Sequence, residues 1–242
     1  MTRARSPRFW LITLAALVAV GSTLGLGAWQ MDRAGQKLAL QAAIDQREAM
    51  PALPQQALLG ASAYQELIHR QVVLHGTWQP QHTVFLDNRQ MQGKPGFYVV
   101  TPLMLEGAAA AVLVERGWVQ RNFTDREKLS PVPAQQGPIE LRGRIVPPPT
   151  KLYEFAGAQR GAIRQNLDLA QFRAETGLPL LDLAVRQTEG PVDGLLRDWP
   201  EAASGAAKNY GYAFQWWALS ALIAILYVWF QLIVPRRNAP HA

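Results

Sequence analysis

Two long apolar stretches, one near each end of the chain, dominate the pattern of hydrophobic and polar positions. The first runs from Phe9 to Ala28 and is interrupted only by small hydroxyl residues, and the second runs from Tyr212 to Val234 without a charged residue. As an α-helix, about 20 apolar residues suffice to cross the hydrocarbon core of a bilayer. We therefore predict transmembrane helices over residues 9–28 and 212–234.

Aromatic residues gather at both ends of the second stretch, at the depths where amphipathic rings prefer to lie. They are Tyr212, Trp216 and Trp217 at its start, and Tyr227, Trp229 and Phe230 near its end. This distribution supports a membrane-spanning helix.

Arginines flank the two stretches on their terminal sides, and such an excess of positive charge marks the cytoplasmic face. They are Arg3, Arg5, Arg8, Arg236 and Arg237. We expect cytoplasmic tails over residues 1–8 and 235–242, and a periplasmic domain over residues 29–211. A signal peptide cleaved after residues 25–28 is the alternative for the first stretch, but its apolar run exceeds the roughly 7 to 15 residues usual there.

The middle of the chain changes to short alternating segments that are typical of strands. A helix over 32–50 is expected to precede them, and Asp168 to cap a short helix that ends near Gly177. Asp87-Asn88 predicts a turn, Gly93 to Gly96 a loop, and Glu106-Gly107 the tip of a hairpin. The predicted strands are 71–78, 83–86, 97–105, 111–120, 139–146 and 180–186. The predicted fold is a membrane protein in which two transmembrane helices flank an α+β, mainly antiparallel β domain.

Composition narrows the classes of function. The chain has no cysteine, which excludes disulfides, thiolate metal sites and a cysteine nucleophile. Its formal net charge is +6. The five flanking arginines account for most of this excess, so membrane topology explains the charge better than binding to nucleic acid.

Motifs of enzymatic chemistry are scarce. The sequence has no G-x-S-x-G elbow, no Walker lysine loop and no H-E-x-x-H. The serines of the middle domain, Ser62, Ser130 and Ser204, lack a motif that would supply a base, so a membrane-tethered hydrolase is a weak alternative. Nothing in the spacing of His69, His75 and His82 predicts that they converge on a metal.

Tryptophans near the domain and membrane boundaries, several of them close to arginines, are the unusual feature. A flat apolar ligand with carboxylates, such as a haem, would suit aromatic walls beside guanidinium donors. Interfacial and core tryptophans are the plainer explanation, and composition leaves both open. The tryptophans are Trp29, Trp78, Trp118, Trp199, Trp216 and Trp217.

Six blocks in order along the chain resemble the surfeit locus protein 1 family of cytochrome c oxidase assembly factors. They are Leu26 to Arg33 followed by Lys37, Gly76 to Trp78, Leu86 to Arg89, Gly96 to Leu103, Val114 to Val119, and Gly211 to Trp216. The resemblance implies a non-enzymatic protein of the bacterial inner membrane that assists haem a insertion into oxidase subunit I, or stabilises that subunit, beside other assembly factors. An envelope sensor or scaffold is the alternative, and self-association stays open.

The resemblance also suggests which residues would hold a haem. In the family a histidine just before the last span has been linked to haem binding, whereas this chain has Asn209 there. A neutral amide is a poor iron ligand compared with imidazole, so the axial ligand is left unassigned. The candidate cofactor-binding residues are Trp29, Arg33, Arg89, Tyr212, Gln215 and Trp216.

Overall fold

The computed structural model describes most of the chain and divides it into two units. The described residues are 6–125, 129, 131–133, 135–149, 161–190, 193–203 and 205–237. Residues 236 and 237 are described by their backbone only. Residues 1–43 and 201–242 form a helical unit, and residues 44–200 form a barrel unit. The termini Arg3 and Arg5 lie outside the described residues.

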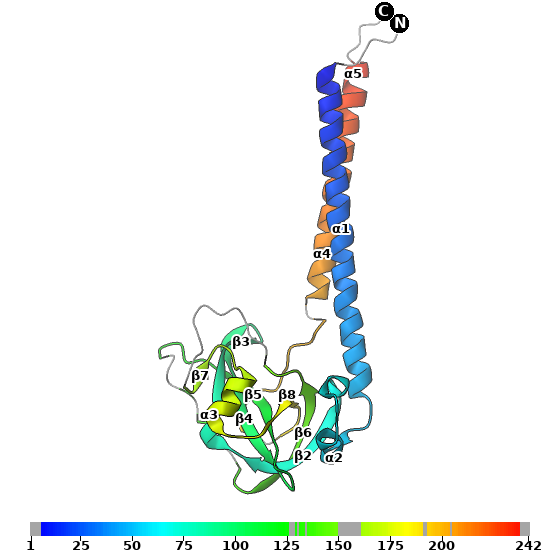
Figure 1. The fold of residues 1–242 in the computed structure, drawn as a ribbon. Coiled ribbons are helices and arrows are strands. Elements are labelled where there is room, and N and C mark those ends of the chain that lie inside the picture. Colours follow the sequence, from blue (N-terminus) through cyan, green and yellow to red (C-terminus); the bar gives the residue numbers. More distant parts are fainter. Residues whose placement is uncertain are drawn as a thin grey trace, which may run out of the picture. The chain divides into compact units, whose positions relative to one another are not determined.

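Two long helices make up the helical unit and run antiparallel beside each other (Figure 1). Helix α1 spans Pro7–Glu48, and helix α4 spans Ala206–Tyr227 and continues through a π-helical segment, Val228–Ile233, into α5, Val234–Arg237. The sequence predicted two separate helices over 9–28 and 32–50. A single helix forms instead, because residues 29–31 contain neither glycine nor proline to interrupt it.

The apolar segments of both long helices remain exposed. Each helix is long and apolar enough to cross a membrane, and only 6% of its most apolar window is buried within the protein. A core helix of a soluble domain would bury such a surface. Both helices are thus candidates for crossing a membrane by their length and composition.

Contacts between α1 and α4 occur along much of their length. The hydroxyls of Thr13 and Tyr227 lie 2.8 Å apart, and Ser220 Oγ donates to the carbonyl of Val20 at 3.5 Å. At Gly27 the approach is so close that an added Cβ would lie 2.2 Å from Trp217 Nε1. A glycine is required there, since any side chain would displace the indole ring.

Among its described residues, the barrel unit contains eight strands and several short helices. The strands are β1 Leu53–Pro54, β2 Gln71–Trp78, β3 Val84–Met91, β4 Lys94–Leu105, β5 Ala111–Gln120, β6 Pro138–Val146, β7 Ile163–Arg164 and β8 Leu180–Gln187. The short helices are α2 Gln55–Leu59, α3 Leu169–Thr176 and the 3₁₀ turns Tyr64–Leu67 and Pro80–His82.

Five of the strands close into a ring. The order is β2-β6-β8-β5-β4, and β4 pairs back onto β2. A ring with an odd number of strands cannot alternate in direction all the way round, and the parallel pair is β5 with β8. The short β1 and β7 add further parallel pairs. Most pairings among the described strands are antiparallel, as predicted, but the sheet as a whole is mixed.

Alternate residues of the ring strands fill the barrel. A five-stranded ring is narrow enough for side chains to fill its interior, and those that do so are almost fully buried. They include Val72, Leu74, Trp78, Leu103, Leu105, Val112, Val114, Leu141, Ile145, Leu183 and Val185. On the opposite face, α3 packs Phe172 against a second cluster that includes Leu86, Val100 and Leu113.

The predicted ends of α3 and the hairpin between β4 and β5 are confirmed. Asp168 Oδ1 accepts from the amide of Gln171 at 2.9 Å, and Gly177 ends the helix in the left-handed region at φ 69°. The hairpin turns at Glu106-Gly107, as predicted.

The predicted turn at Asp87-Asn88 is wrong, and the predicted loop over 93–96 is right only for Gly93, since residues 94–96 belong to β4. Strand β3 continues to Met91, because Asn88 adopts φ 58° and forms a bulge between Leu86 and Arg89. The chain turns instead at Gln92 and Gly93, with φ values of 52° and 74°, as in a two-residue hairpin.

The burial of Phe172 predicts that α3 depends on this one side chain. Phe172→Ala should lower the free energy of unfolding by about 3–5 kcal/mol, as expected when a large core side chain is lost. Gln171→Ala, on the more exposed neighbouring position of the same helix, should change it little. Thermal unfolding of the purified full-length chain measures the difference, and equal stability of the two variants would contradict this packing.

Candidate functional site

A chain of amide and ammonium groups joins the two helices of the helical unit. Asn209 on α4 donates from Nδ2 to Gln30 Oε1 at 2.6 Å and accepts at Oδ1 from Lys37 Nζ at 2.9 Å. We call Gln30, Lys37 and Asn209 the amide bridge. Both polar atoms of the Asn209 side chain are in use, so this residue serves to join α1 to α4.

The other predicted site residues of the helical unit do not converge in this way. Trp29 and Tyr212 are 54% and 51% exposed, Gln215 is exposed and Trp216 is half-buried. Arg33 is exposed and donates to Gln36 Oε1 at 3.2 Å, one turn further along its own helix. The structure thus brings together Gln30 and Asn209, which neighbour these residues in sequence.

Three of the sequence blocks meet around Arg89 in the barrel unit. The indole of Trp118 donates to the carbonyl of Arg89 at 2.8 Å. Gly96 makes room for this ring, since a Cβ there would lie 2.4 Å from its atoms. The guanidinium of Arg89 then lies 5.8 Å from the centre of the Tyr98 ring. The spacing of these blocks therefore reflects a single local packing arrangement.

A second arginine and a tryptophan complete this surface. The rings of Tyr98 and Trp199 lie 5.1 Å apart, edge to face, and Arg186 lies 4.7 Å from the centre of the Trp199 ring. Arg186 Nε donates to Glu115 Oε2 at 2.7 Å. We call Arg89, Tyr98, Glu115, Arg186 and Trp199 the arginine–aromatic cluster.

Partial burial shifts the ionisation of this cluster. Burial raises the pKa of Tyr98, which keeps its hydroxyl protonated at neutral pH. Burial lowers the pKa of Arg89, and the nearby Glu115 opposes that change. A guanidinium starts from so high a pKa that it stays charged. Of this cluster the sequence singled out only Arg89 as a site residue; Trp199 was noted as a boundary tryptophan, and no pattern indicated Arg186.

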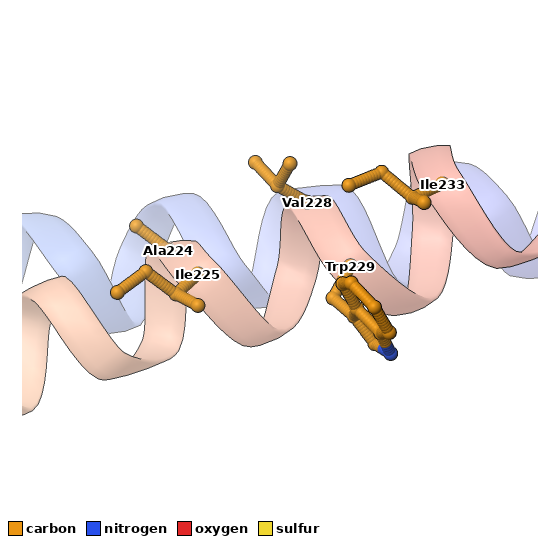
Figure 2. Close-up of a pocket in the computed structure, with 5 residues that line it drawn as sticks. All are labelled: Ala224, Ile225, Val228, Trp229 and Ile233. Atoms are coloured by element: carbon orange, nitrogen blue, oxygen red, sulfur yellow. The ribbon is translucent and has the colours of Figure 1, made fainter.

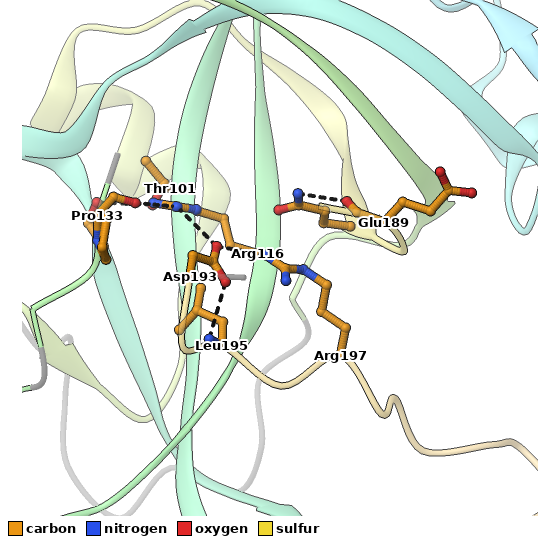
Figure 3. Close-up of polar contacts among 9 residues, drawn as sticks. Thr101, Arg116, Pro133, Glu189, Asp193, Leu195 and Arg197 are labelled. Atoms are coloured by element: carbon orange, nitrogen blue, oxygen red, sulfur yellow. Dashed lines mark hydrogen bonds and ion pairs between the residues drawn. The ribbon is translucent and has the colours of Figure 1, made fainter. Parts of the chain in front are cut away.

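Arg116 has a different role, which Figure 3 shows. Its Nη2 lies 3.6 Å from Asp193 Oδ2 and donates to the carbonyl of Pro133 at 2.6 Å. Asp193 also accepts from Arg197 at 2.7 Å. The side chains of Arg116 and Asp193 are 4% and 5% exposed, and Arg116 covers the Trp78 ring at 4.7 Å. We call Arg116, Asp193 and Arg197 the arginine–aspartate cluster, and its burial makes it structural.

Groups suited to metal binding or hydrolysis do not assemble in the described residues. In the ranges given above, no three His, Cys, Asp or Glu side chains lie close enough to hold a metal ion. His75 Nε2 lies 3.6 Å from Glu140 on an exposed surface, and Ser62 is exposed. Ser130, Ser204 and His241 lie outside the described residues.

An apolar groove lies where α4 continues into the π-helical segment. Figure 2 shows its lining, which consists of Ala224, Ile225, Val228, Trp229 and Ile233. These side chains offer no group that would orient a polar ligand. The groove is therefore best regarded as part of the apolar surface.

Together, the fold and these clusters define a class of protein: a small closed β-barrel inserted between two long apolar helices. The model of the SURF1 family matches residues 17–221, which include most of both helices and the whole barrel. The chain belongs to the SURF1 family.

Three relatives illustrate the similarity. A SURF1-like protein of Rickettsia bellii (strain RML369-C) is 26% identical over 236 residues, covering 94% of this chain and 91% of the relative. A SURF1-like protein of Drosophila melanogaster is 28% identical over 250 residues, covering 96% and 79%. The cytochrome oxidase assembly protein SHY1 of Saccharomyces cerevisiae (strain ATCC 204508 / S288c) is 27% identical over 106 residues, covering 44% and 26%.

The buried ion pair predicts a large difference between two aspartates. Asp193→Ala should lower the free energy of unfolding by about 3–5 kcal/mol, because it leaves two guanidinium groups without their carboxylate in a buried site. Asp182→Ala is the matched control, since Asp182 pairs with Arg173 but is 72% exposed. Its loss should cost about 0–1 kcal/mol. Similar thermal unfolding of both variants would refute a structural role for Asp193.

Proposed function

We propose that this chain assists the assembly of cytochrome c oxidase and does so without catalysing a reaction. The observation that carries this proposal is membership in the SURF1 family, matched over residues 17–221. One relative, SHY1, is named as a cytochrome oxidase assembly protein. The step we propose is haem a insertion into subunit I, or stabilisation of that subunit, in company with other assembly factors.

The proposed location is the bacterial inner membrane, with the barrel unit on the periplasmic side. Two exposed apolar helices of sufficient length support a membrane anchor. The arginines outside both apolar stretches support cytoplasmic ends for both helices.

A haem would require two things of this chain: a ligand for iron and cations for its propionates. Asn209 does not fit the first requirement, because Lys37 and Gln30 already occupy both polar atoms of its amide. The arginines of the candidate set fit the second, since a guanidinium matches a carboxylate in shape and charge. We therefore propose no iron ligation at position 209. Trp29, Arg33, Arg89, Tyr212, Gln215 and Trp216 remain the residues proposed for contact with a cofactor or client.

The absence of catalysis is supported by the use of the charged groups. In the part of the chain that the structure describes, the shielded carboxylates Glu115 and Asp193 are held by arginines, and the buried Asp87 is engaged in an interaction as well. Such groups suit a scaffold better than an active site.

A deletion strain tests the assembly proposal. Membranes lacking this protein should lose most of the oxidase signal in reduced-minus-oxidised spectra, and a plasmid copy should restore it. An undiminished signal in the deletion strain would disprove the proposal.

Variants of Asn209 in that strain test the amide bridge. Asn209→His should keep the oxidase signal, because neutral imidazole can accept from Lys37 and donate to Gln30 at the same time. Asn209→Leu should reduce the signal several-fold at equal protein level, because it leaves both partners without a bond. A histidine variant that binds haem more tightly and raises the oxidase yield would instead favour iron ligation at this position.

A further inference from the structure

Hydrogen-bond donors without acceptors gather in the arginine–aromatic cluster. Arg186 uses its Nε for Glu115, and its terminal nitrogens make no further bond with the described residues. The guanidinium of Arg89 is stacked near Tyr98 and has no carboxylate partner there. The hydroxyl of Tyr98 likewise has no partner among the described residues. The two cations thus lie against two rings that contact each other, Arg89 against Tyr98 and Arg186 against Trp199.

The carboxylates near the two guanidinium groups are themselves shielded from solvent. Glu115 is bound to Arg186 and its side chain is 6% exposed, and Asp87, which also acts electrostatically on Arg89, is 4% exposed. The polar groups left accessible on this half-buried surface are therefore the two guanidinium groups and the Tyr98 hydroxyl. Charges interact more strongly there than in bulk water, so an arriving anion would be attracted to this surface.

The arginine–aspartate cluster shows an arginine of the same domain that is closed off from solvent and bound to a carboxylate, although its Nε has no hydrogen-bond partner. There, Arg116 has a carboxylate, a carbonyl oxygen and a tryptophan face, and it is 4% exposed. Arg89 has only a tyrosine face and remains accessible. Arg116 thus differs from Arg89 in contacting a carboxylate and in being buried with it.

We propose that Arg89, Arg186 and Tyr98 bind a carboxylate of a ligand, with Trp199 contacting the apolar part that carries it. The flat fork of a guanidinium matches the two oxygens of a carboxylate. The inference rests on the proposed function only for the source of the carboxylate, which is either a porphyrin propionate or an acidic side chain of a client protein.

Titration calorimetry on the full-length protein in detergent tests this site. The probes are metal-free protoporphyrin IX, its dimethyl ester, a glutamate-rich peptide and the same peptide with glutamine in place of glutamate. The ester and the glutamine peptide lack the carboxylates, and they also report non-specific partition into detergent. One carboxylate probe should bind, and its neutral counterpart should not.

Variants then locate the binding. Arg89→Gln should weaken binding of that probe by about tenfold, as expected for a charged hydrogen bond, and Tyr98→Phe by about fivefold. Tyr98→Phe keeps the ring against Trp199, so folding is preserved. Arg142→Gln is the matched control, because Arg142 lies on the exposed side of β6 beside Glu140, and it should bind the probe normally.

Either carboxylate probe supports the site, and the one that binds identifies the source. Failure of both probes to bind, or unchanged binding by Arg89→Gln and Tyr98→Phe, would overturn the proposal. The oxidase assay separates this result from the assembly function. If the deletion strain has normal oxidase while binding depends on Arg89, the proposed function is refuted and the site is kept. If the deletion strain loses oxidase while binding does not depend on Arg89, the function is kept and the site is refuted.

Discussion

The parallel contact between β5 and β8 is the constraint on which the barrel unit depends. An odd ring must contain a parallel pair, and here its register places Glu115 opposite Arg186. Their side chains meet at 2.7 Å. The same contact that closes the barrel therefore fixes one half of the arginine–aromatic cluster. Any change that shifted β8 along β5 would separate this ion pair as well as the apolar core.

Arg116, which follows Glu115 on β5, belongs to a different cluster from its neighbour. A register irregularity between Val99 and Val100 leaves Arg116 extra in the pairing of β4 with β5. Glu115 and Arg116 consequently contribute to different clusters, although they are neighbours in sequence. The cluster at Arg116 is sealed by Asp193, whereas the one at Glu115 keeps unused donors. The buried contact of Arg116 with Asp193 stabilises the domain. The unbonded donors near Glu115 are those that we propose bind a ligand.

Much of the fold was predictable because it depends on local patterns. The apolar runs, the cap at Asp168 and the hairpin at Glu106-Gly107 each follow from a few neighbouring residues. The closure of the five strands into a ring was not predictable, since it depends on pairing between strands far apart in the chain. The turn was misplaced because Asn88 tolerates positive φ equally in a turn and in a bulge.

The same limit applies to the candidate sites. The sequence drew attention to Arg89, to Trp118 and to the block that contains Arg116, and the structure places all three residues in polar or packing networks. It could not tell the sealed Arg116 from the accessible Arg89, because the distinguishing partners are distant in sequence. Asp193 lies 77 positions after Arg116, and Arg186 lies 71 after Glu115. Only the folded register determines which arginine has a carboxylate.

Position 209 illustrates how one structural requirement can admit two residue types. The amide bridge needs a flat group that accepts from Lys37 on one side and donates to Gln30 on the other. Asparagine and neutral histidine share this property, whereas alanine, leucine and aspartate do not. Iron ligation, by contrast, requires the imidazole nitrogen itself. Asn209 can join the two helices but cannot supply the imidazole nitrogen that iron ligation requires. The residue type at position 209 is therefore explained by the pairing of α1 with α4.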